Sequence, residues 1–542
     1  MGSEGGVMQR QLGRRSVRAL LLLVCWTSLC ALWLPARQRA PPTSTTPIPR
    51  PPLPSDPEIE PRDENLLIDA ERHLPSLPLT YWLKHRYEVN KSYKSKDCAP
   101  FPSVFDLEYS DMYWQTLRTS QGVFHLYGAY LDARNTSHTG PTVRLLAVHD
   151  RIQPKLATYC QLWFEERSGP VVVLILEYVY MWPSVWGNYR DGALLPYLVV
   201  CALPADVRAL RPAAVSLVEQ PCDRATNCLR VHFDEPPDRT QKEFAICVKG
   251  LDFQHEDISM RLVEWIELVR LLGADKIFFY EFEVHPNISK VLAYYRARGL
   301  VDITPITLPG GQPNFPSLRH IYMKKRLTYK RQMELVPYND CLYRHMYQYR
   351  WLTLLDIDEV IVPMQDPDWK SLLKRVTSLA APMSGKPPRS SYFARNVYYL
   401  DEQEPTLCLE TGAPSYMYML QHVHRTRNFT KPDSNIKAFH ETGRVLALHN
   451  HFPISCIGGQ CSAYPMGTTQ ARLHHYRANC ARELSKEVRA EPVRDAVLWR
   501  WADQLVPRVT QALTELGLIR PKPSTNNTSS THMPANSRSP AQ

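Results

Sequence analysis

Glu243–Tyr280 reads EFAICVKGLDFQHEDISMRLVEWIELVRLLGADKIFFY, and this stretch holds two apolar runs separated by a segment of helical period. The run 244–248 predicts a strand, because it is short, apolar and followed by polar residues. Apolar residues then recur every three or four positions over 258–272, which predicts a helix that ends at Gly273. The run 276–280 predicts the next strand. Strand, helix and strand in this order are typical of parallel strands joined by a crossover helix.

The same alternation continues toward the C-terminus. We expect a helix over 287–298, a strand over 301–308, a helix over 338–350 and a strand over 351–355. Four such repeats predict an α/β domain with a parallel sheet, whose ligands lie beyond the carboxyl ends of the strands. We assign this domain to residues 243–482.

Three acidic residues follow the fourth predicted strand, as Asp356-Ile-Asp358-Glu359. Carboxylates at the tip of an apolar strand are costly unless a cation or hydrogen-bond donors compensate them. Strand alternation predicts that Asp356 and Asp358 face the same side, where both could bind Mn²⁺ or Mg²⁺ and a nucleoside diphosphate. A second pair, Asp366-Pro-Asp368, follows a proline in a polar stretch and is interpreted as a turn and helix cap.

Two other classes of protein share this pattern. A haloacid-dehalogenase-type phosphatase would use Asp356 as nucleophile and Asp358 as general acid, but it requires a downstream acidic pair and places its motif on the first strand. A non-catalytic glycan-binding protein on a degenerate enzyme fold is the third alternative.

Several short motifs taken in order resemble glycosyltransferase family 92. They are Cys247-Val-Lys249-Gly, Val263-Glu-Trp265-Ile-Glu with Leu272-Gly273-Ala-Asp-Lys-Ile-Phe-Phe-Tyr280, Asn339-Asp340-Cys341-Leu, Asp356-Ile-Asp358-Glu359 and His475-Tyr476-Arg477. The resemblance implies a GT-A-like, Rossmannoid nucleotide-sugar domain. It also implies an inverting, metal-dependent transfer, with a β linkage, of galactose from UDP-galactose to a glycan on a glycoprotein or glycolipid.

Site residues follow from the resemblance position by position. Asp356 and Asp358 match the metal and diphosphate motif, with Glu359 as support. His475 matches a further metal ligand, although the adjacent His474 leaves open which imidazole faces inward, and Arg477 is a candidate diphosphate clamp.

Three more residues are nucleotide candidates, and two cysteines match positions of the family. Lys249 and Tyr280 lie at the ends of the first two strands, where uracil and ribose would rest, and Asp340 is a similar candidate. Cys247 and Cys341 match family positions, so a bridge between them is an expectation of the resemblance.

Inverting transfer also needs a base near the acceptor hydroxyl. We expect an acidic residue after a fifth strand over Tyr392–Tyr399. The candidates are Asp401, Glu402, Glu404 and Glu410, of which Glu410 is favoured because an apolar run precedes it.

The N-terminus indicates the compartment. Four Arg precede the apolar span 19–34, which predicts a signal anchor with residues 1–18 in the cytosol; a cleaved signal peptide is the alternative. Residues 35–65 are rich in Pro and Thr and are interpreted as a stem. Together with the resemblance, this predicts a single-pass type II protein of the Golgi membrane.

The remaining segments are assigned from their composition. Residues 66–242 contain short β-rich runs that predict a sandwich-like module, either a scaffold, a glycan-contacting module or part of the catalytic unit. Residues 483–520 are expected to be helical and solvent-facing, and 521–542 disordered.

Charge and cysteine content exclude some partners. The net charge is +10, but residues 1–40 contain six Arg and one Glu, so the rest is too weakly basic for a nucleic-acid partner. The basic stretch 322–330 is interpreted as a solvated face or acceptor rim. Cys222 with Cys228, and Cys456 with Cys461, are close enough to form small loops. His449-Asn450-His451 resembles a metal pair and is expected at a strand end near the donor cleft.

Overall fold

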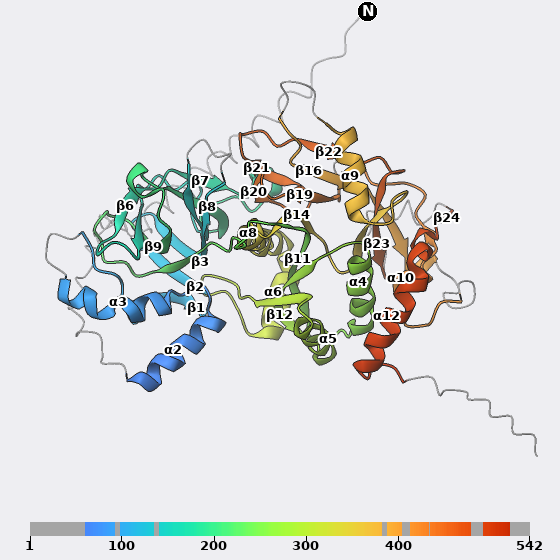
Figure 1. Cartoon of the computed structure of the whole chain (residues 1–542), viewed down its shortest axis with the longest axis horizontal. Coiled ribbons are helices and arrows are strands. Elements are labelled where there is room, and N and C mark those ends of the chain that lie inside the picture. The colour runs from blue at the N-terminus through green and yellow to red at the C-terminus, as the bar shows by residue number, and fades with distance from the viewer. Residues whose placement is uncertain are drawn as a thin grey trace, which may run out of the picture. The chain divides into compact units, whose positions relative to one another are not determined.

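The computed structural model describes residues 60–92, 98–134, 140–381, 387–403, 412–432, 434–478 and 491–520 (Figure 1). The expected anchor at 19–34, the tail at 521–542 and most of the expected stem lie outside these residues. Within the described part of the chain, no helix has both the length and the apolar character needed to cross a membrane.

The described residues of the N-terminal module form two α-helices and ten strands. Its strands form one continuous sheet in the order β6-β5-β9-β10-β3-β4-β8-β7, with β2 paired to β3 and β1 to β2. The elements are α2 (Pro61–His73), α3 (Leu79–Ser92), β1 (Tyr109–Asp111), β2 (Trp114–Thr119), β3 (Gly122–Asp132), β4 (Thr142–His149), β5 (Tyr159–Phe164), β6 (Val171–Leu174), β7 (Glu177–Tyr180), β8 (Leu195–Ala202), β9 (Pro212–Val218) and β10 (Leu229–His232).

The β-rich module is confirmed, and its strands pair as one continuous sheet whose two sides face each other across a shared core. The single sheet curls on itself. Strand β6 contacts β8, and a disulfide joins Cys160 of β5 to Cys201 of β8. One face of β3 buries Phe124 and Leu126 in the module's own core. The other face places Tyr130 in a core shared with the α/β domain. The sheet therefore packs between two cores.

The α/β domain confirms the predicted alternation. Four parallel strands lie in the order β13-β12-β11-β14, and three further strands extend the sheet as β19-β16-β22. The first part contains β11 (Lys242–Phe253), α4 (Ser259–Leu271), β12 (Lys276–Val284), α5 (Pro286–Ala297), β13 (Val301–Pro305), α6 (Pro316–Lys325), α7 (Leu327–Met333), α8 (Leu335–His345) and β14 (Tyr349–Leu354).

The second part of the domain adds small sheets beside the main one. Its elements are β15 (Glu359–Pro363), α9 (Trp369–Leu379), β16 (Ser391–Ala394), β17 (Asn396–Leu400), α10 (Tyr418–Gln421), β18 (His424–Arg425), β19 (Lys437–Glu441), β20 (Val445–Leu448), β21 (Pro453–Cys456), β22 (Ala463–Pro465), β23 (Ala471–Arg477), β24 (Val493–Arg494) and α12 (Ala502–Glu515). Among these, β15, β23 and β17 form a three-stranded sheet.

The expected fifth strand is divided in two. β16 belongs to the main sheet, whereas β17 pairs with β23 in the small one. The chain changes sheets at Arg395, whose side chain donates to the carbonyl of Thr430. An apolar run therefore indicated strand character correctly but could not show that its two halves pair with different partners.

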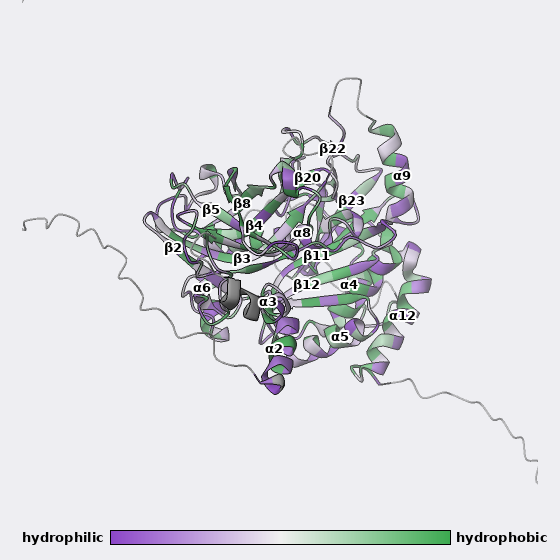
Figure 2. Ribbon diagram, turned by 60° about the vertical axis from the view of Figure 1, so that its left-hand side comes forward, coloured by the Kyte–Doolittle hydropathy of each residue, from purple (hydrophilic) through white to green (hydrophobic). Residues whose placement is uncertain are grey.

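The expectation of a solvent-facing C-terminal segment is wrong. Helix α12 packs against α4 and buries Leu505, Val509 and Leu513 in the domain core. These residues recur at i, i+4 and i+8, so they form one apolar stripe on the helix. Figure 2 shows α12 with both hydrophilic and hydrophobic residues beside α4.

Two of the expected disulfides are confirmed, and one is wrong. Cys456 pairs with Cys461, and Cys247 of β11 pairs with Cys341 of α8. Cys222 pairs with Cys98, not with Cys228. Cys228 is a free cysteine buried in a cluster of aromatic and aliphatic side chains, whereas Cys222 is exposed.

Candidate active site at the carboxyl ends of the parallel strands

The acidic motif forms a turn between β14 and β15. Strand β14 ends at Leu354, and the backbone N–H of Glu359 donates to the carbonyl oxygen of Asp356 at 3.0 Å. Asp356 and Asp358 therefore lie on the turn and not on a strand, so strand alternation is not what orients them. Glu359 begins β15 and is buried.

Two cavities meet at this turn. The first, of about 470 Å³, lies among the end of β11, the start of α4 and Tyr418. The second, of about 690 Å³, lies among α7, α8, the segment after β20 and part of the N-terminal module. Four residues line both cavities, namely Lys249, Lys330, Asp358 and Arg477. These four residues form the border between the cavities, and a ligand bound to them would extend into both cavities.

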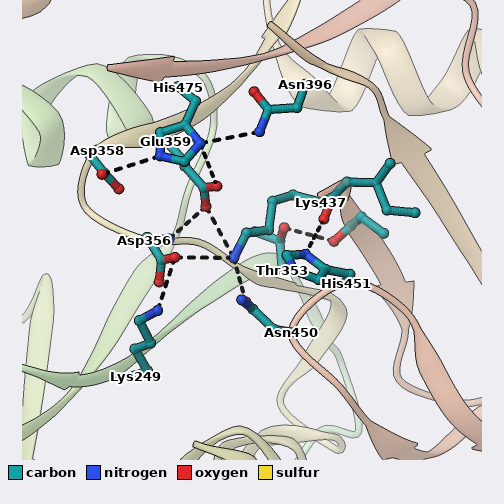
Figure 3. A network of polar contacts seen from close by, with 12 residues as sticks. Lys249, Thr353, Asp356, Asp358, Glu359, Asn396, Lys437, Asn450, His451 and His475 are labelled. Atoms are coloured by element: carbon teal, nitrogen blue, oxygen red, sulfur yellow. Dashed lines mark hydrogen bonds and ion pairs between the residues drawn. The ribbon is translucent and has the colours of Figure 1, made fainter. Parts of the chain in front are cut away.

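Two lysines compensate the acidic motif (Figure 3). Lys249 Nζ lies 3.2 Å from Asp356 Oδ2 and 3.4 Å from Glu334 Oε1. Lys437 is fully buried, and its Nζ lies 3.1 Å from Glu359 Oε2 and 3.6 Å from Asp356 Oδ2. Burial acts to raise the pKa of Asp356, but Lys249 and Lys437 together hold that pKa well below its usual value. Asp356 is therefore charged at neutral pH.

His475 faces the acidic motif. Its Nε2 lies 3.4 Å from Asp358 Oδ2, and its Nδ1 lies 3.3 Å from Glu359 Oε1 and 3.2 Å from the amide nitrogen of Asn396. Burial acts to lower the pKa of His475, but the two carboxylates raise it above the ordinary value.

The side chain of the adjacent His474 points to the opposite face of β23. It is buried against Tyr399 and Tyr476, and burial lowers its pKa to about 3. The structure therefore decides which imidazole faces the motif, because successive side chains of a strand point to opposite faces.

The motif carries suitable donors for a divalent cation. Asp356 Oδ1 is buried and makes no hydrogen bond with a described residue. Asp358 Oδ2 and His475 Nε2 are 3.4 Å apart, close to the ~3 Å that separates neighbouring ligands of one Mn²⁺ or Mg²⁺ ion. Oxygen and imidazole nitrogen donors suit Mn²⁺. Within the described ranges, no three His, Cys, Asp or Glu side chains are already grouped around one point, so binding would require small side-chain shifts.

Residues 242–509 match the sequence model of glycosyltransferase family 92. The chain carries a glycosyltransferase family 92 domain. The beta-1,4-galactosyltransferase galt-1 of Caenorhabditis elegans is 29% identical over 130 residues, which are 24% of this chain and 27% of the worm protein. The chain thus matches about a quarter of the length of that relative.

Two residues expected near the nucleotide lie elsewhere in the family 92 domain. Tyr280 and Asp340 are both buried and line neither cavity. The Tyr280 hydroxyl donates to Asp340 Oδ2 at 2.6 Å, and Arg344 donates to both oxygens of the same carboxylate. Tyr130 of the N-terminal module donates to Asp340 as well. The donors compensate the buried carboxylate of Asp340, and because one of them is Tyr130, the cluster joins the module to the domain.

Of the expected bases, the two that the structure describes, Asp401 and Glu402, do not line either cavity. Glu402 is exposed, while Asp401 accepts hydrogen bonds from Tyr418 and His422. Glu404 and Glu410 lie outside the described residues. Of the described carboxylates, the second cavity is lined by Glu334 and Asp358. Sequence reasoning missed Glu334, because it lies at a junction between two helices without any motif around it.

The predicted diphosphate clamp Arg477 and the basic residue Lys330 lie where the two cavities meet. Both line the two cavities, and neither side chain has a hydrogen-bond or ion-pair partner among the described residues. Lys330 ends the basic stretch 322–330, whereas Lys324, Lys325 and Arg326 are exposed. The stretch therefore borders the second cavity at Leu327, Thr328 and Lys330, while its three consecutive basic residues face solvent.

The expected histidine pair lines the second cavity. His449 and His451 follow β20, and burial lowers their pKa to about 3 and about 4. Both imidazoles are therefore neutral at physiological pH. His451 Nδ1 is engaged by the carbonyl of Ile436 at 2.8 Å, so that nitrogen is not free for a metal.

Asp366 and Asp368 have the structural role that was predicted for them. Asp368 is the N-cap of α9 and accepts from the backbone N–H of Ser371 at 2.7 Å. Asp366 forms an ion pair with Arg375. The second Asp-x-Asp pair therefore stabilises a helix start and lies outside both cavities.

Proposed function

We propose that the chain is an inverting, metal-dependent galactosyltransferase that moves galactose from UDP-galactose to a glycan acceptor with a β linkage. The observation that carries this proposal is the position of Asp356 and Asp358, with His475, where two cavities of the family 92 domain meet. The name of the worm relative supports galactose as the sugar and a β linkage as the product.

Each part of the donor and the metal ion would bind to a different set of residues at the two cavities. The nucleotide would occupy the first cavity, which lies beyond the end of β11, where ligands of parallel sheets bind. Arg477 and Lys330 would bind the diphosphate at the border, because unpaired cations there attract phosphate oxygens. Asp356, Asp358 and His475 would hold Mn²⁺ or Mg²⁺, which supplies charge neutralisation for the departing nucleotide.

The phosphatase and lectin alternatives are weaker. The acidic motif follows the fourth strand of the parallel group and not the first, and the matched family is one of glycosyltransferases. A lectin would not need unpaired cations beside the carboxylates. Both alternatives are nevertheless outcomes of the assay below.

The first prediction concerns donor choice and metal dependence. The purified full chain, incubated with UDP-galactose, UDP-glucose and UDP-N-acetylglucosamine, should release UDP fastest from UDP-galactose in the presence of Mn²⁺. Removal of the metal with EDTA should lower the rate at least tenfold, and added Mn²⁺ should restore it. Release of phosphate from simple monoesters would instead favour the phosphatase, and sugar binding without turnover would favour the lectin.

The second prediction concerns the base. We propose Glu334, because it is a carboxylate of the second cavity with one oxygen 3.4 Å from Lys249. Glu334→Gln should lower kcat of transfer about 10²-fold or more, since a positioned base contributes that much. Glu402→Gln is the matched control and should retain the wild-type rate. The opposite pattern would return the role to the segment after β17.

The location follows from the sequence expectation. We propose that residues 19–34 anchor the chain in the Golgi membrane with the family 92 domain in the lumen. The four disulfides among the described residues fit an oxidising compartment. Protease treatment of sealed Golgi vesicles should leave the domain intact, and digestion of the domain without detergent would contradict this topology.

A further inference from the structure

The N-terminal module supplies two aromatic residues to the second cavity. Trp182 and Trp186 follow β7 and line this cavity together with residues of the family 92 domain. The module is therefore a wall of the site.

The segment 182–188, which contains Trp182 and Trp186, is held in place by two side-chain hydrogen bonds. The Trp182 Nε1–H donates to the carbonyl of Gly187 at 2.7 Å, and Gly187 adopts a φ of 81°, which favours glycine. The Asn188 amide donates to the side chain of the buried Gln332 of α7 at 2.7 Å. These bonds fix the segment against the domain, so the position of Trp186 is set by the fold.

Trp186 belongs to an aromatic cluster at the cavity. Its ring centroid lies 4.5 Å from that of His449, with 38° between the planes, and 5.8 Å from that of Phe452. Trp182 packs edge-on against Trp186 at 5.0 Å. Both Trp186 and Phe452 are only partly buried, so each keeps an exposed portion.

Polar groups lie in the same cavity as the aromatic cluster. Glu334, Asn450 and Arg331 line it, and the Arg331 side chain makes no hydrogen bond or ion pair with a described residue. A sugar ring presents apolar C–H faces and a rim of hydroxyl groups. A cavity that combines aromatic surface with a few polar groups matches both features.

The residues at the border between the cavities indicate from which side the acceptor approaches the donor sugar. A donor whose diphosphate is bound by Arg477 and Lys330 has its nucleotide in the first cavity and its sugar beside the second. The acceptor must then approach from the second cavity, because the first is filled.

We propose that the second cavity is the acceptor site, that it binds a sugar ring against Trp186, and that the N-terminal module is thereby part of the active site. This inference rests on the proposed function, because it takes the first cavity as the donor site.

The test separates acceptor binding from donor use. The full chain is assayed with UDP-galactose and four acceptors, the p-nitrophenyl β-glycosides of galactose, glucose, mannose and N-acetylglucosamine. Trp186→Ala should raise the KM for the best acceptor about tenfold or more, whereas the KM for UDP-galactose should change less than twofold. Trp186→Phe should recover part of the loss, because it restores an aromatic face.

The neighbouring Val185 provides the matched control. Its side chain is 85% exposed and lines neither cavity, so Val185→Ala should leave both KM values unchanged. An unchanged acceptor KM in Trp186→Ala would overturn the inference, as would an equal rise in both KM values. Hydrolysis of UDP-galactose by the wild type with transfer to none of the glycosides would also count against it. Absence of any reaction with UDP-galactose in the wild type would instead refute the proposed function.

Discussion

Replacement of Asp356 or Asp358 by Asn should lower kcat of sugar transfer about 10²–10³-fold. Each change removes a negative charge at the border of the two cavities without changing side-chain size, so the loss reports electrostatic stabilisation. In Asp356→Asn, Lys249 and Lys437 also lose a carboxylate partner. The measurement is kcat with saturating UDP-galactose and Mn²⁺, together with the Mn²⁺ concentration that gives half the maximal rate.

The chain contains its own control for this experiment. Asp368→Asn changes the same residue type in the other Asp-x-Asp pair, where the carboxylate caps α9. Because Asn is also a good N-cap, this variant should keep both its activity and its stability. Full turnover by Asp358→Asn, with an unchanged response to Mn²⁺, would refute the proposed role of the motif.

Lys437→Met should destabilise the fold by about 3–5 kcal/mol. The lysine is fully buried, and its Nζ lies between Glu359 and Asp356, so its removal leaves the buried Glu359 without its lysine partner and Asp356 with Lys249 alone. Asn450 also loses the hydrogen bond that its side chain accepts from Lys437. Urea unfolding of the variant and the wild type, followed by tryptophan fluorescence, measures the difference.

Two further variants separate charge compensation from packing. Adding Glu359→Gln to Lys437→Met should restore part of the stability, because it removes the buried charge that Lys437 compensated. Lys370→Met, at an exposed lysine 3.9 Å from Glu243, should change the stability by no more than about 0.5 kcal/mol. If the double variant were as unstable as Lys437→Met alone, the loss would have to be ascribed to packing.

Two predictions from the sequence succeeded because their signals are local. The run 244–248 and the helical period of 258–272 each lie within one element, so the strand and helix could be predicted without a partner. The bridge between Cys456 and Cys461 closes a loop of a few residues, which is also a local feature.

Other features could not be predicted because they depend on partners far away in the sequence. Cys222 is six positions from Cys228 but pairs with Cys98, 124 positions away, and Cys228 lies in a buried cluster. The run 392–399 has strand character throughout, yet its halves join different sheets. Tyr280 and Asp340 stand at positions typical of a ligand site, but they face the N-terminal module and not a cavity.

The sequence by itself determined the parallel α/β core, the acidic motif after its fourth strand and the family to which that order of motifs belongs. Only the tertiary structure decided that Lys437 compensates the motif, that His475 and not His474 faces it, and that Trp186 and Glu334 line the cavity beside it. The physical reason is that periodicity is set by neighbouring residues, whereas these contacts depend on strand register and on the packing of two cores. Lys437 is 81 positions from Asp356 in the chain, and Trp186 is 263 positions from His449.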